Sequence, residues 1–276
     1  MTMENVRKLD PIPVIGIVGI HALALLAFYY VSTSAVVLCV VLAWLSGWVG
    51  IALCFHRLLT HRSFKTQKWF EYFLTIMGTL AWQGSPVKWV GTHRLHHKWS
   101  DTDHDPHTPN HGFWWAHVLW LFYKDDRRRE AVAAAGDLAR DKGLALIDRF
   151  FWVPQAFLTI LLFGGGMIVG GLDEALSWVG WGIGVRTVFV YHSTWFVNSA
   201  AHTWGYKNPK AHDNSRNLWW VALFGAGEGY HSNHHADPSC AAHGIKWWEF
   251  DPTYRTIQLL ACVGLASDIV RPSKDD

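Results

Sequence analysis

Residues 35–61 read Ala-Val-Val-Leu-Cys-Val-Val-Leu-Ala-Trp-Leu-Ser-Gly-Trp-Val-Gly-Ile-Ala-Leu-Cys-Phe-His-Arg-Leu-Leu-Thr-His. The stretch from Ala35 to Phe55 contains no charged side chain, and it is as long as the roughly 20 apolar residues that cross a bilayer core as a helix. It runs directly into the paired histidines His56 and His61. The sequence therefore predicts a membrane-spanning helix that ends at a polar, histidine-bearing surface.

Three other stretches have the same apolar character, and together the four set the fold class. Half of the 276 residues are hydrophobic, yet the mean hydropathy is only +0.08, so long apolar stretches alternate with very polar ones. We predict an all-α integral membrane protein with four transmembrane helices in two hairpins, and a helical cap made of residues 56–150 and 197–276. We expect residues 1–276 to form a single domain. The predicted spans are Ile12–Val31, Ala35–Phe55, Phe151–Gly171 and Ala175–Phe196.

Basic residues around these spans predict the orientation of the chain. Lys and Arg precede the first span, follow the second and precede the third, whereas the turns near Ser32–Ser34 and Leu172–Glu174 carry none. Because basic residues concentrate on the cytoplasmic side, we expect both termini and all the histidine groups there. The first span is too long for a signal peptide and lacks a small-residue cleavage pattern, so we expect it to stay in the mature chain.

Two regions outside the spans carry their own predictions. The segment Trp69–Trp82 is apolar but short for a span, which favours an interfacial or re-entrant helix. Residues from Lys124 to Arg149 mix acidic and basic side chains with helix-forming Ala, Glu and Arg, and they predict an amphipathic helix on the cap.

Composition also argues against several classes of protein. The net charge of +2 is too small to suggest nucleic-acid binding, and the Arg127–Arg129 run fits the cytoplasmic side of a membrane. The cysteines are scattered without paired spacing, which argues against a disulfide framework or a thiolate metal site and predicts small core residues. They are Cys39, Cys54, Cys240 and Cys262.

Eight histidines form three boxes with regular spacing. Box 1 is His56-Arg-Leu-Leu-Thr-His61, box 2 is His93-Arg-Leu-His96-His97, and box 3 is His231-Ser-Asn-His234-His235. Positions i, i+3 and i+4 share one face of a helix, so the rings of box 2 converge, and those of box 3 do likewise. The two histidines of box 1 are about 140° apart on an ideal helix, so they require an unwound helix end or two metals side by side.

The boxes predict a site with more than one metal. One histidine pair alone could be a solvated or hydrogen-bonded pair, but three boxes on one side of a membrane favour metal ligation. A zinc hydrolase is a poor match because His-Glu-x-x-His is absent, and haem would need only one or two axial histidines. A pair of irons takes about eight to ten ligands and can activate O₂, so we expect O₂ chemistry on a lipophilic substrate.

The order of the boxes, with four spans in two hairpins, resembles the membrane fatty acid desaturase family. The flanking residues share this resemblance, in His-Arg-Leu-Leu-Thr-His-Arg-Ser-Phe (56–64), Asp-Thr-Asp-His-Asp-Pro (101–106), Asn-Ser-Ala-Ala-His (198–202) and Gly-Glu-Gly-Tyr-His (227–231). The chain is most similar to the delta-9 branch, which includes stearoyl-CoA desaturases and the acyl-lipid desaturases of cyanobacteria and plants. The stretch Thr92–Phe122 is most similar to the acyl-lipid enzymes.

The resemblance implies a di-iron centre with O₂ as co-substrate and a ligand set that spans all three boxes. Asn198 would reach the second iron through a water molecule. The nine histidine ligands would be His56, His61, His93, His96, His97, His202, His231, His234 and His235.

Other polar residues near the boxes have less certain roles on sequence grounds. Five carboxylates could accept hydrogen bonds from the far ring nitrogens of ligands or could simply be solvated: Asp101, Asp103, Asp105, Glu228 and Asp237. We expect the remaining histidines to lie near the metals, at the surface or in packed polar contacts: His104, His107, His111, His117, His21 and His192, with His212 and His243 lacking any supporting spacing.

The implied reaction is delta-9 desaturation, the removal of two hydrogens from adjacent methylenes of a C16 or C18 acyl chain. The acyl tunnel would then set the position of the double bond. Tunnel candidates, which could equally belong to an aromatic belt at the membrane surface, are Trp82, Gln83, Trp89, Thr194 and Trp195. Arg186 is costly inside a span, so it should face protein or snorkel, and the sequence assigns it no role.

The acyl carrier and the electron donor follow from two further features. Acyl-CoA desaturases commonly show Trp-x-Arg-Asp before box 2, but this chain has Trp89-Val-Gly91-Thr92. A membrane glycerolipid is therefore favoured over acyl-CoA as the substrate. The chain has no extension for a fused cytochrome b5, so we expect a separate donor, ferredoxin rather than cytochrome b5, and a thylakoid or plasma membrane location if the source is cyanobacterial.

Two alternatives remain open from the sequence. The same boxes serve related membrane hydroxylases, in which oxygen ends on carbon. A membrane metal transporter would instead line its spans with histidines, but only His21 and His192 lie within the predicted spans.

Overall fold

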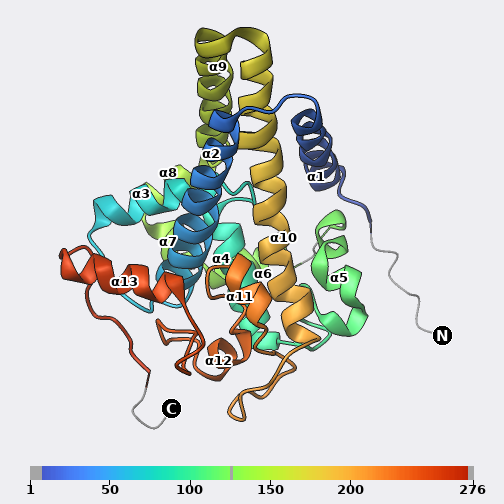
Figure 1. Ribbon diagram of the computed structural model, residues 1–276. Coiled ribbons are helices and arrows are strands. Elements are labelled where there is room, and N and C mark those ends of the chain that lie inside the picture. Colours follow the sequence, from blue (N-terminus) through green and yellow to red (C-terminus); the bar gives the residue numbers. More distant parts are fainter. Residues whose placement is uncertain (1–7, 125–126, 273–276) are drawn as a thin grey trace.

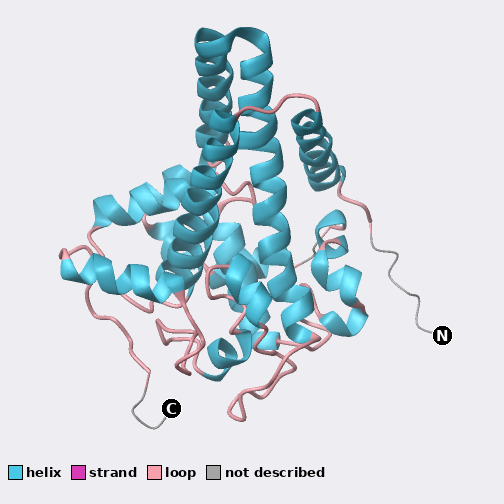
Figure 2. Cartoon of the chain, viewed as in Figure 1, coloured by secondary structure: helices cyan, strands magenta, loops and turns pink. Residues whose placement is uncertain are grey.

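The computed structural model describes residues 8–124 and 127–272 of the chain. All regular elements in these two ranges are helices, and they form two parts (Figures 1 and 2). Long helices stand side by side in a bundle at one end of the molecule. Short helices and loops surround the other end, where the histidine boxes lie.

The bundle contains three helical segments that are long and apolar enough to span a membrane: Pro11–Phe28, Thr33–Thr60 and Val153–His202. The first joins α1 (Pro11–Ala24) to η1 (Leu25–Phe28), and the second joins α2 (Thr33–Ala43) to η2 (Trp44–Thr60), a π-helix. The third consists of α9 (Val153–Val179), the π-helix η5 (Gly180–Val185), α10 (Arg186–Ser199) and η6 (Ala200–His202). This segment covers both of the last two predicted spans.

The third segment folds back on itself inside α9. Gly170 and Gly171 have non-helical backbone angles, and the φ of +71° at Gly171 is one that glycine adopts without steric cost. The two limbs run in opposite directions beside each other, as Figure 1 shows at the top of α9. Glu174, just past the fold, accepts hydrogen bonds from Ser32 (2.9 Å) and Trp178 (2.5 Å), which ties the turns of both hairpins together.

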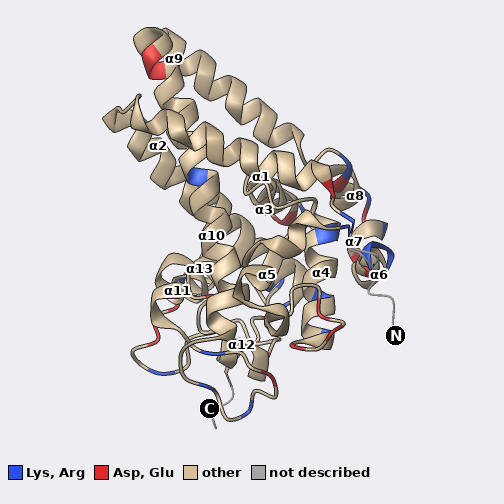
Figure 3. Cartoon of the chain, turned by 90° about the vertical axis from the view of Figure 1, so that its right-hand side faces the viewer, with Lys and Arg blue, Asp and Glu red and all other residues tan. Residues whose placement is uncertain are grey.

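The other end of the molecule is built from short elements. Figure 3 shows basic and acidic residues interspersed there and around α6 to α8, whereas the upper bundle carries little charge besides one basic patch between α2 and α10 and the acidic tip of α9. The elements are α3 (Lys68–Thr79), α4 (Pro86–Trp99), η3 (Pro109–His111), α5 (Phe113–His117), η4 (Leu119–Phe122), α6 (Arg128–Ala134), α7 (Gly136–Arg140), α8 (Lys142–Arg149), α11 (Trp219–Phe224), α12 (His231–Ala236) and α13 (Pro252–Cys262).

Two sequence predictions can be compared directly with these elements. The segment Trp69–Trp82 was predicted to be helical, and α3 occupies most of it. The segment Lys124–Arg149 divides into the three helices α6 to α8 because Ala135 and Asp141 leave helical geometry, while residues 125–126 lie outside the described residues. Of the four cysteines, three are buried as expected, but Cys262 is exposed at the end of α13, which corrects that prediction.

The main core packs η2 against α3, α4 and α13. Phe55, Leu59, Leu74 and Ile257 are almost completely buried there. Burial of each such side chain contributes roughly 1.5–3 kcal/mol. This core fixes the lower end of η2, and with it box 1, against the helix that carries box 2.

Candidate metal centre

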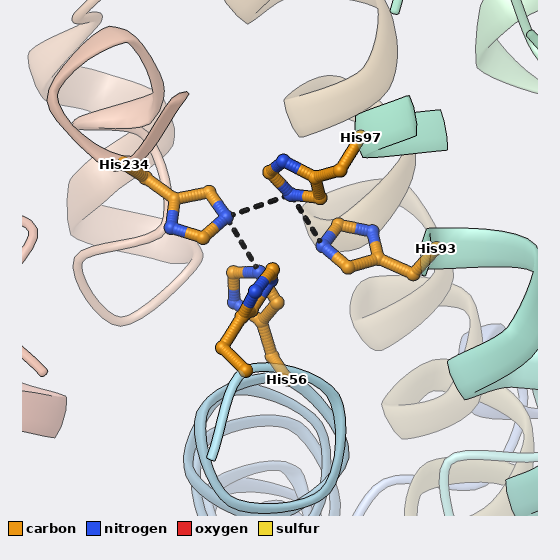
Figure 4. Close-up of side chains that lie close together, drawn as sticks. His56, His93, His97 and His234 are labelled. Carbon is orange, nitrogen blue, oxygen red and sulfur yellow. Dashed lines mark hydrogen bonds between the residues drawn. The ribbon is translucent and has the colours of Figure 1, made fainter. Parts of the chain in front are cut away.

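Five histidines from three different elements form the first cluster: His56 and His61 at the end of η2, His93 and His97 on α4, and His234 on α12. One ring nitrogen of each lies within 4.8 Å of those of the others. The Nε2 atoms of His56 and His234 are 3.1 Å apart, those of His234 and His97 are 2.9 Å apart, and those of His97 and His93 are 3.1 Å apart (Figure 4). These rings aim at a common centre.

The geometry of η2 explains how box 1 can direct both of its rings to this centre. In a π-helix the backbone hydrogen bond joins residues five apart. His61 N–H donates such a bond to the carbonyl of His56 (3.1 Å), so the two residues are stacked on the same side of the helix. Their ring centroids are 4.8 Å apart. The wide turn therefore takes the place of the two alternatives that the 140° separation predicted, an unwound helix end or two metals side by side.

Four histidines form the second cluster: His96 on α4, His202 in η6, and His231 and His235 on α12. Their ligand-capable nitrogens also lie within 4.8 Å of one another, and the Nε2 atoms of His231 and His235 are 3.0 Å apart. The two clusters are neighbours, because the rings of His97 and His235 stack with centroids 4.4 Å apart.

Each of boxes 2 and 3 is therefore divided between the clusters. The i, i+4 pairs stay together, His93 with His97 and His231 with His235, whereas His96 and His234 cross to the opposite cluster. We expected each box to converge on one point, and this expectation was too simple. Contributions of this kind from α4 and α12 produce two adjacent metal-sized sites.

Carboxylates pair with the Nδ1 atoms of one histidine in the first cluster and three in the second. His96 Nδ1–H donates to Asp105 (2.9 Å), His202 Nδ1–H donates to Asp101 (3.1 Å), and the Nδ1 atoms of His56 and His235 pair with Glu228 and Asp213. A carboxylate at Nδ1 fixes the tautomer so that the Nε2 lone pair is free for a metal. This arrangement is typical of metal-binding histidines.

The sequence identified three of these four carboxylates. Asp213 was missed because it lies in an irregular loop with no spacing relation to a box. Asp103 and Asp237 have other roles: the Asp103 side chain is 92% exposed beside His111, and Asp237 accepts hydrogen bonds from Ser239.

Burial and charge set the protonation of the site. Burial, with a further contribution from neighbouring histidines, holds the pKa values of His93, His97, His231 and His234 well below the usual value. These rings are therefore neutral at pH 7, which is the form that binds metal. Burial alone would raise the pKa of Asp105, but its interactions with His96 and His107, including hydrogen bonds from the His96 ring and the His107 backbone, outweigh it and lower that pKa, so the carboxylate is ionised.

The donor atoms fit a pair of transition-metal ions. Among the described residues, the Nε2 atoms of His61, His96 and His202 are buried and have no hydrogen-bond partner. Buried polar atoms without a partner are rare, and a cation in each cluster would satisfy these three lone pairs. Imidazole suits iron, copper and zinc, so the nitrogen donors show that a metal fits without selecting one.

His243 is a further histidine of the site that the sequence did not identify. We found no supporting spacing for it, yet its side chain is almost fully buried, its ring lies 4.4 Å from that of His234, and its Nδ1 is 3.6 Å from Glu228. A loop brings it there, because Asn233 donates to its carbonyl (2.8 Å). The remaining unassigned residue, His212, is exposed.

The other histidines lie outside the two clusters. His104 and His111 are exposed, whereas His107 is buried with its ring 4.4 Å from that of His96. His117 contacts His192 through ring nitrogens 3.0 Å apart, and His192 lies 3.3 Å from His21. The expectation of packed polar contacts for the two span histidines agrees with this geometry.

An apolar cavity of about 340 Å³ reaches the first cluster at His93. Its wall contains His93 of the first cluster, together with His107 and Asn198. A smaller cavity of about 50 Å³ lies between η2, α10 and α11 and touches His56, His93 and His231. All five tunnel candidates lie in the wall of the larger cavity: Trp82, Gln83, Trp89, Thr194 and Trp195.

Comparison with known proteins agrees with this geometry. The family model for fatty acid desaturases matches residues 32–261. The chain is 48% identical over 253 residues to the sn-1 stearoyl-lipid 9-desaturase of Anabaena variabilis, covering 91% of this chain and 90% of that one. It is 45% identical over 258 residues to the sn-2 palmitoyl-lipid 9-desaturase of Nostoc sp. (strain 36), covering 91% and 86%.

A plant relative shows that related enzymes differ in carrier and in double-bond position. The chain is 41% identical over 272 residues to the acyl-CoA C20 Delta5-desaturase of Anemone leveillei, covering 96% of this chain and 83% of that one. The extent of these matches leaves no doubt about the family, which generally uses iron. The chain belongs to the fatty acid desaturase family and is a membrane-bound oxidoreductase.

Proposed function

We propose that this protein is an acyl-lipid delta-9 desaturase. It removes two hydrogens from adjacent methylenes of a saturated C16 or C18 chain that is esterified in a membrane glycerolipid. The observation that carries this proposal is that the wall of an apolar cavity includes Asn198 and His93, a member of the first histidine cluster. The relatives that act on stearoyl and palmitoyl lipids at position 9 support the same substrate class.

The nine histidines would hold two iron ions, one in each cluster, with Asn198 reaching the second through water. Reduced iron in a nitrogen-rich site supplies O₂-dependent oxidation of an unactivated carbon-hydrogen bond. The chain itself fixes the ligands. Four carboxylates accept from the Nδ1 atoms of ligand histidines, which keeps the proton on Nδ1 and leaves the Nε2 lone pair directed inward. They are Asp101, Asp105, Asp213 and Glu228.

The cavity wall is suited to holding an acyl chain in one conformation. Trp89 Nε1–H donates to Gln83 (3.0 Å), and the Gln83 amide donates to Thr194 (2.8 Å). These polar groups bond to one another, so the chain meets mainly apolar surface. Which carbon-carbon bond lies beside His93 then follows from the length and bend of the cavity.

The packing of Gly91 favours a lipid over acyl-CoA. The helix α6 lies across α4 at this residue, and a Cβ atom at Gly91 would be 1.9 Å from the carbonyl oxygen of Ala131. An arginine that could meet a coenzyme A phosphate therefore has no room at the position where the acyl-CoA pattern places one. A glycerolipid substrate carries no coenzyme A phosphate, so it does not need an arginine at this position.

For the membrane arrangement, we propose four spans and a cytoplasmic cap within a single domain. The fold at Gly170–Gly171 supports two spans within the third apolar segment, and the charge distribution in Figure 3 supports a cytoplasmic histidine-bearing end. Reporter fusions after residues 32, 150, 172 and 272 would test this. Cytoplasmic signals are expected at 150 and 272 and external signals at 32 and 172.

The electrons would come from a separate carrier, ferredoxin in preference to cytochrome b5. Similarity to the cyanobacterial acyl-lipid enzymes supports this choice. Membranes that contain the protein should form product with reduced ferredoxin and not with reduced cytochrome b5. The opposite preference would reject ferredoxin as the donor.

The function is tested by gas chromatography with mass spectrometry of fatty acids from a desaturase-free host that expresses the protein. A new monounsaturated acid with the double bond at the ninth carbon is expected in the glycerolipid fraction, and it should vanish in a His96→Ala variant. A hydroxy acid would assign a hydroxylase instead. Product confined to the acyl-CoA pool would reject the lipid carrier.

A further inference from the structure

Arg186 is a fully buried cation within an apolar helix, and the reaction described above gives it no task. Its Nε–H donates to the Gly182 carbonyl (3.0 Å), and its terminal nitrogens donate to Gln155 Oε1 (3.0 Å), Ser46 Oγ (3.4 Å) and the carbonyl of Leu80. A charged side chain inside a membrane span is costly and commonly marks function. One acceptor, Gly182, lies in η5 just before α10. The other three lie in three other elements: Gln155 in α9, Ser46 in η2 and Leu80 at the end of α3.

The bond to Leu80 has a specific structural consequence. Leu80 ends α3, where the carbonyls of the last turn lack partners and carry a partial negative charge. Arg186 supplies a hydrogen-bond donor to the Leu80 carbonyl at this helix end. The chain then enters residues 80–84, which turn into the wall of the large cavity.

Residues 80–84 adopt a conformation that needs outside support. Trp82 has a φ of +59°, in the left-handed region that a bulky side chain rarely occupies. Such a residue costs of order 1–3 kcal/mol and persists only where its surroundings hold it. Two other side chains on successive turns of α10 do so, since Tyr191 Oη–H donates to the Trp82 carbonyl (2.8 Å) and Thr194 accepts from Gln83 (2.8 Å).

We propose that Arg186 is a positioning residue that sets the site of desaturation by fixing residues 80–84 against α10. This inference rests on the proposed desaturase function. Arg186 and Tyr191 hold the carbonyls of Leu80 and Trp82, and these bonds place the Trp82 and Gln83 side chains in the cavity wall. A looser segment would let the acyl chain slide, so more than one carbon-carbon bond would reach the clusters.

The test compares three variants by the positions of their double bonds, with iron content and melting temperature measured on the same preparations. Arg186→Lys keeps the charge but cannot hold all the acceptors, and Tyr191→Phe removes only the bond to Trp82. Gln155→Leu is the matched control, because it removes a bond of Arg186 that does not involve residues 80–84.

We expect the ratio of the main isomer to all other isomers to fall about tenfold in Arg186→Lys and about fivefold in Tyr191→Phe, as expected for the loss of one or two hydrogen bonds. Both variants should retain iron. Gln155→Leu should melt at a lower temperature with an unchanged ratio.

Wild-type isomer ratios in both Arg186→Lys and Tyr191→Phe, with only yield and melting temperature reduced, would overturn the inference. The same shift in Gln155→Leu would also overturn it, because general loosening would then be the cause. If Arg186→Lys does not accumulate, Tyr191→Phe decides alone. A wild-type enzyme whose main isomer is not at the ninth carbon would reject the proposed position separately, while the ratios would still decide the role of Arg186.

Discussion

The buried carboxylate Asp105 offers a sharp test of how the second cluster holds metal. Its side chain is fully buried, accepts from His96 Nδ1 (2.9 Å) and also accepts from the backbone N–H groups of Asp101 and His107 (both 3.1 Å). Asp105→Asn has almost the same shape but lacks the charge. The substitution therefore removes the electrostatic support of His96 with little change in packing.

The expected size of the effect comes from the position of Asp105 directly behind one ligand. Loss of such a partner typically weakens metal binding 10–100-fold, or about 1.4–2.7 kcal/mol. His96 belongs to the second cluster alone, so the loss should be confined to one of the two metals. Asparagine can still accept from Nδ1–H, which keeps the effect well below complete loss.

The assay is iron content per chain after graded exposure to a chelator. The wild type should lose its two irons together, whereas Asp105→Asn should lose one at a 10–100-fold lower chelator concentration. Asp103→Asn is the matched control, because the Asp103 side chain is 92% exposed on the same loop. Identical curves for the wild type and Asp105→Asn, or an equal loss in Asp103→Asn, would refute the reasoning.

Two further predictions concern stability. Asp141 caps α8, and although burial would raise its pKa, hydrogen bonds that include one from Lys68 lower it to about 2. Its contribution is therefore complete above the unfolded pKa of about 4 and is lost as the pH falls towards 2. Asp141→Ala should lower the free energy of unfolding by about 0.5–2 kcal/mol at pH 7, with a smaller deficit near pH 2, and an equal deficit at both pH values would contradict the pKa. Gly91→Ala would place a Cβ atom 1.9 Å from the Ala131 oxygen, so we expect the free energy of unfolding to fall by about 1–3 kcal/mol and the melting temperature to fall with it. Gly164→Ala is the control: its added Cβ meets nothing within 4 Å, so it should melt like the wild type.

Much of the site could be predicted from local spacing. The separation i, i+4 alone places His93 with His97 and His231 with His235, because it is a property of any helix. The apolar stretches likewise follow from composition. The sequence predicts four apolar spans, whereas the structure has three apolar helical segments in its described residues. The last two predicted spans belong to one segment, because the chain turns back within only two residues, Gly170 and Gly171.

The division of ligands between two clusters could not be predicted in this way. His96 does not group with His93 and His97 of its own box, because His202 and His235 approach its side of α4 from other parts of the chain. The π-helix at box 1 is also invisible to a pattern that assumes 3.6 residues per turn. Asp213 and His243 reach the site from irregular loops, whose course depends on tertiary contacts such as the bond from Asn233 to the His243 carbonyl.

The most direct test of the proposed centre is the iron content of the purified protein after loading under anaerobic conditions. Two clusters of buried imidazoles predict two irons per chain in the wild type. They predict one iron in a His97→Ala variant and one in a His96→Ala variant, with different spectra because each variant empties a different cluster. A single iron in the wild type, or identical spectra for the two variants, would contradict the assignment of one metal to each cluster.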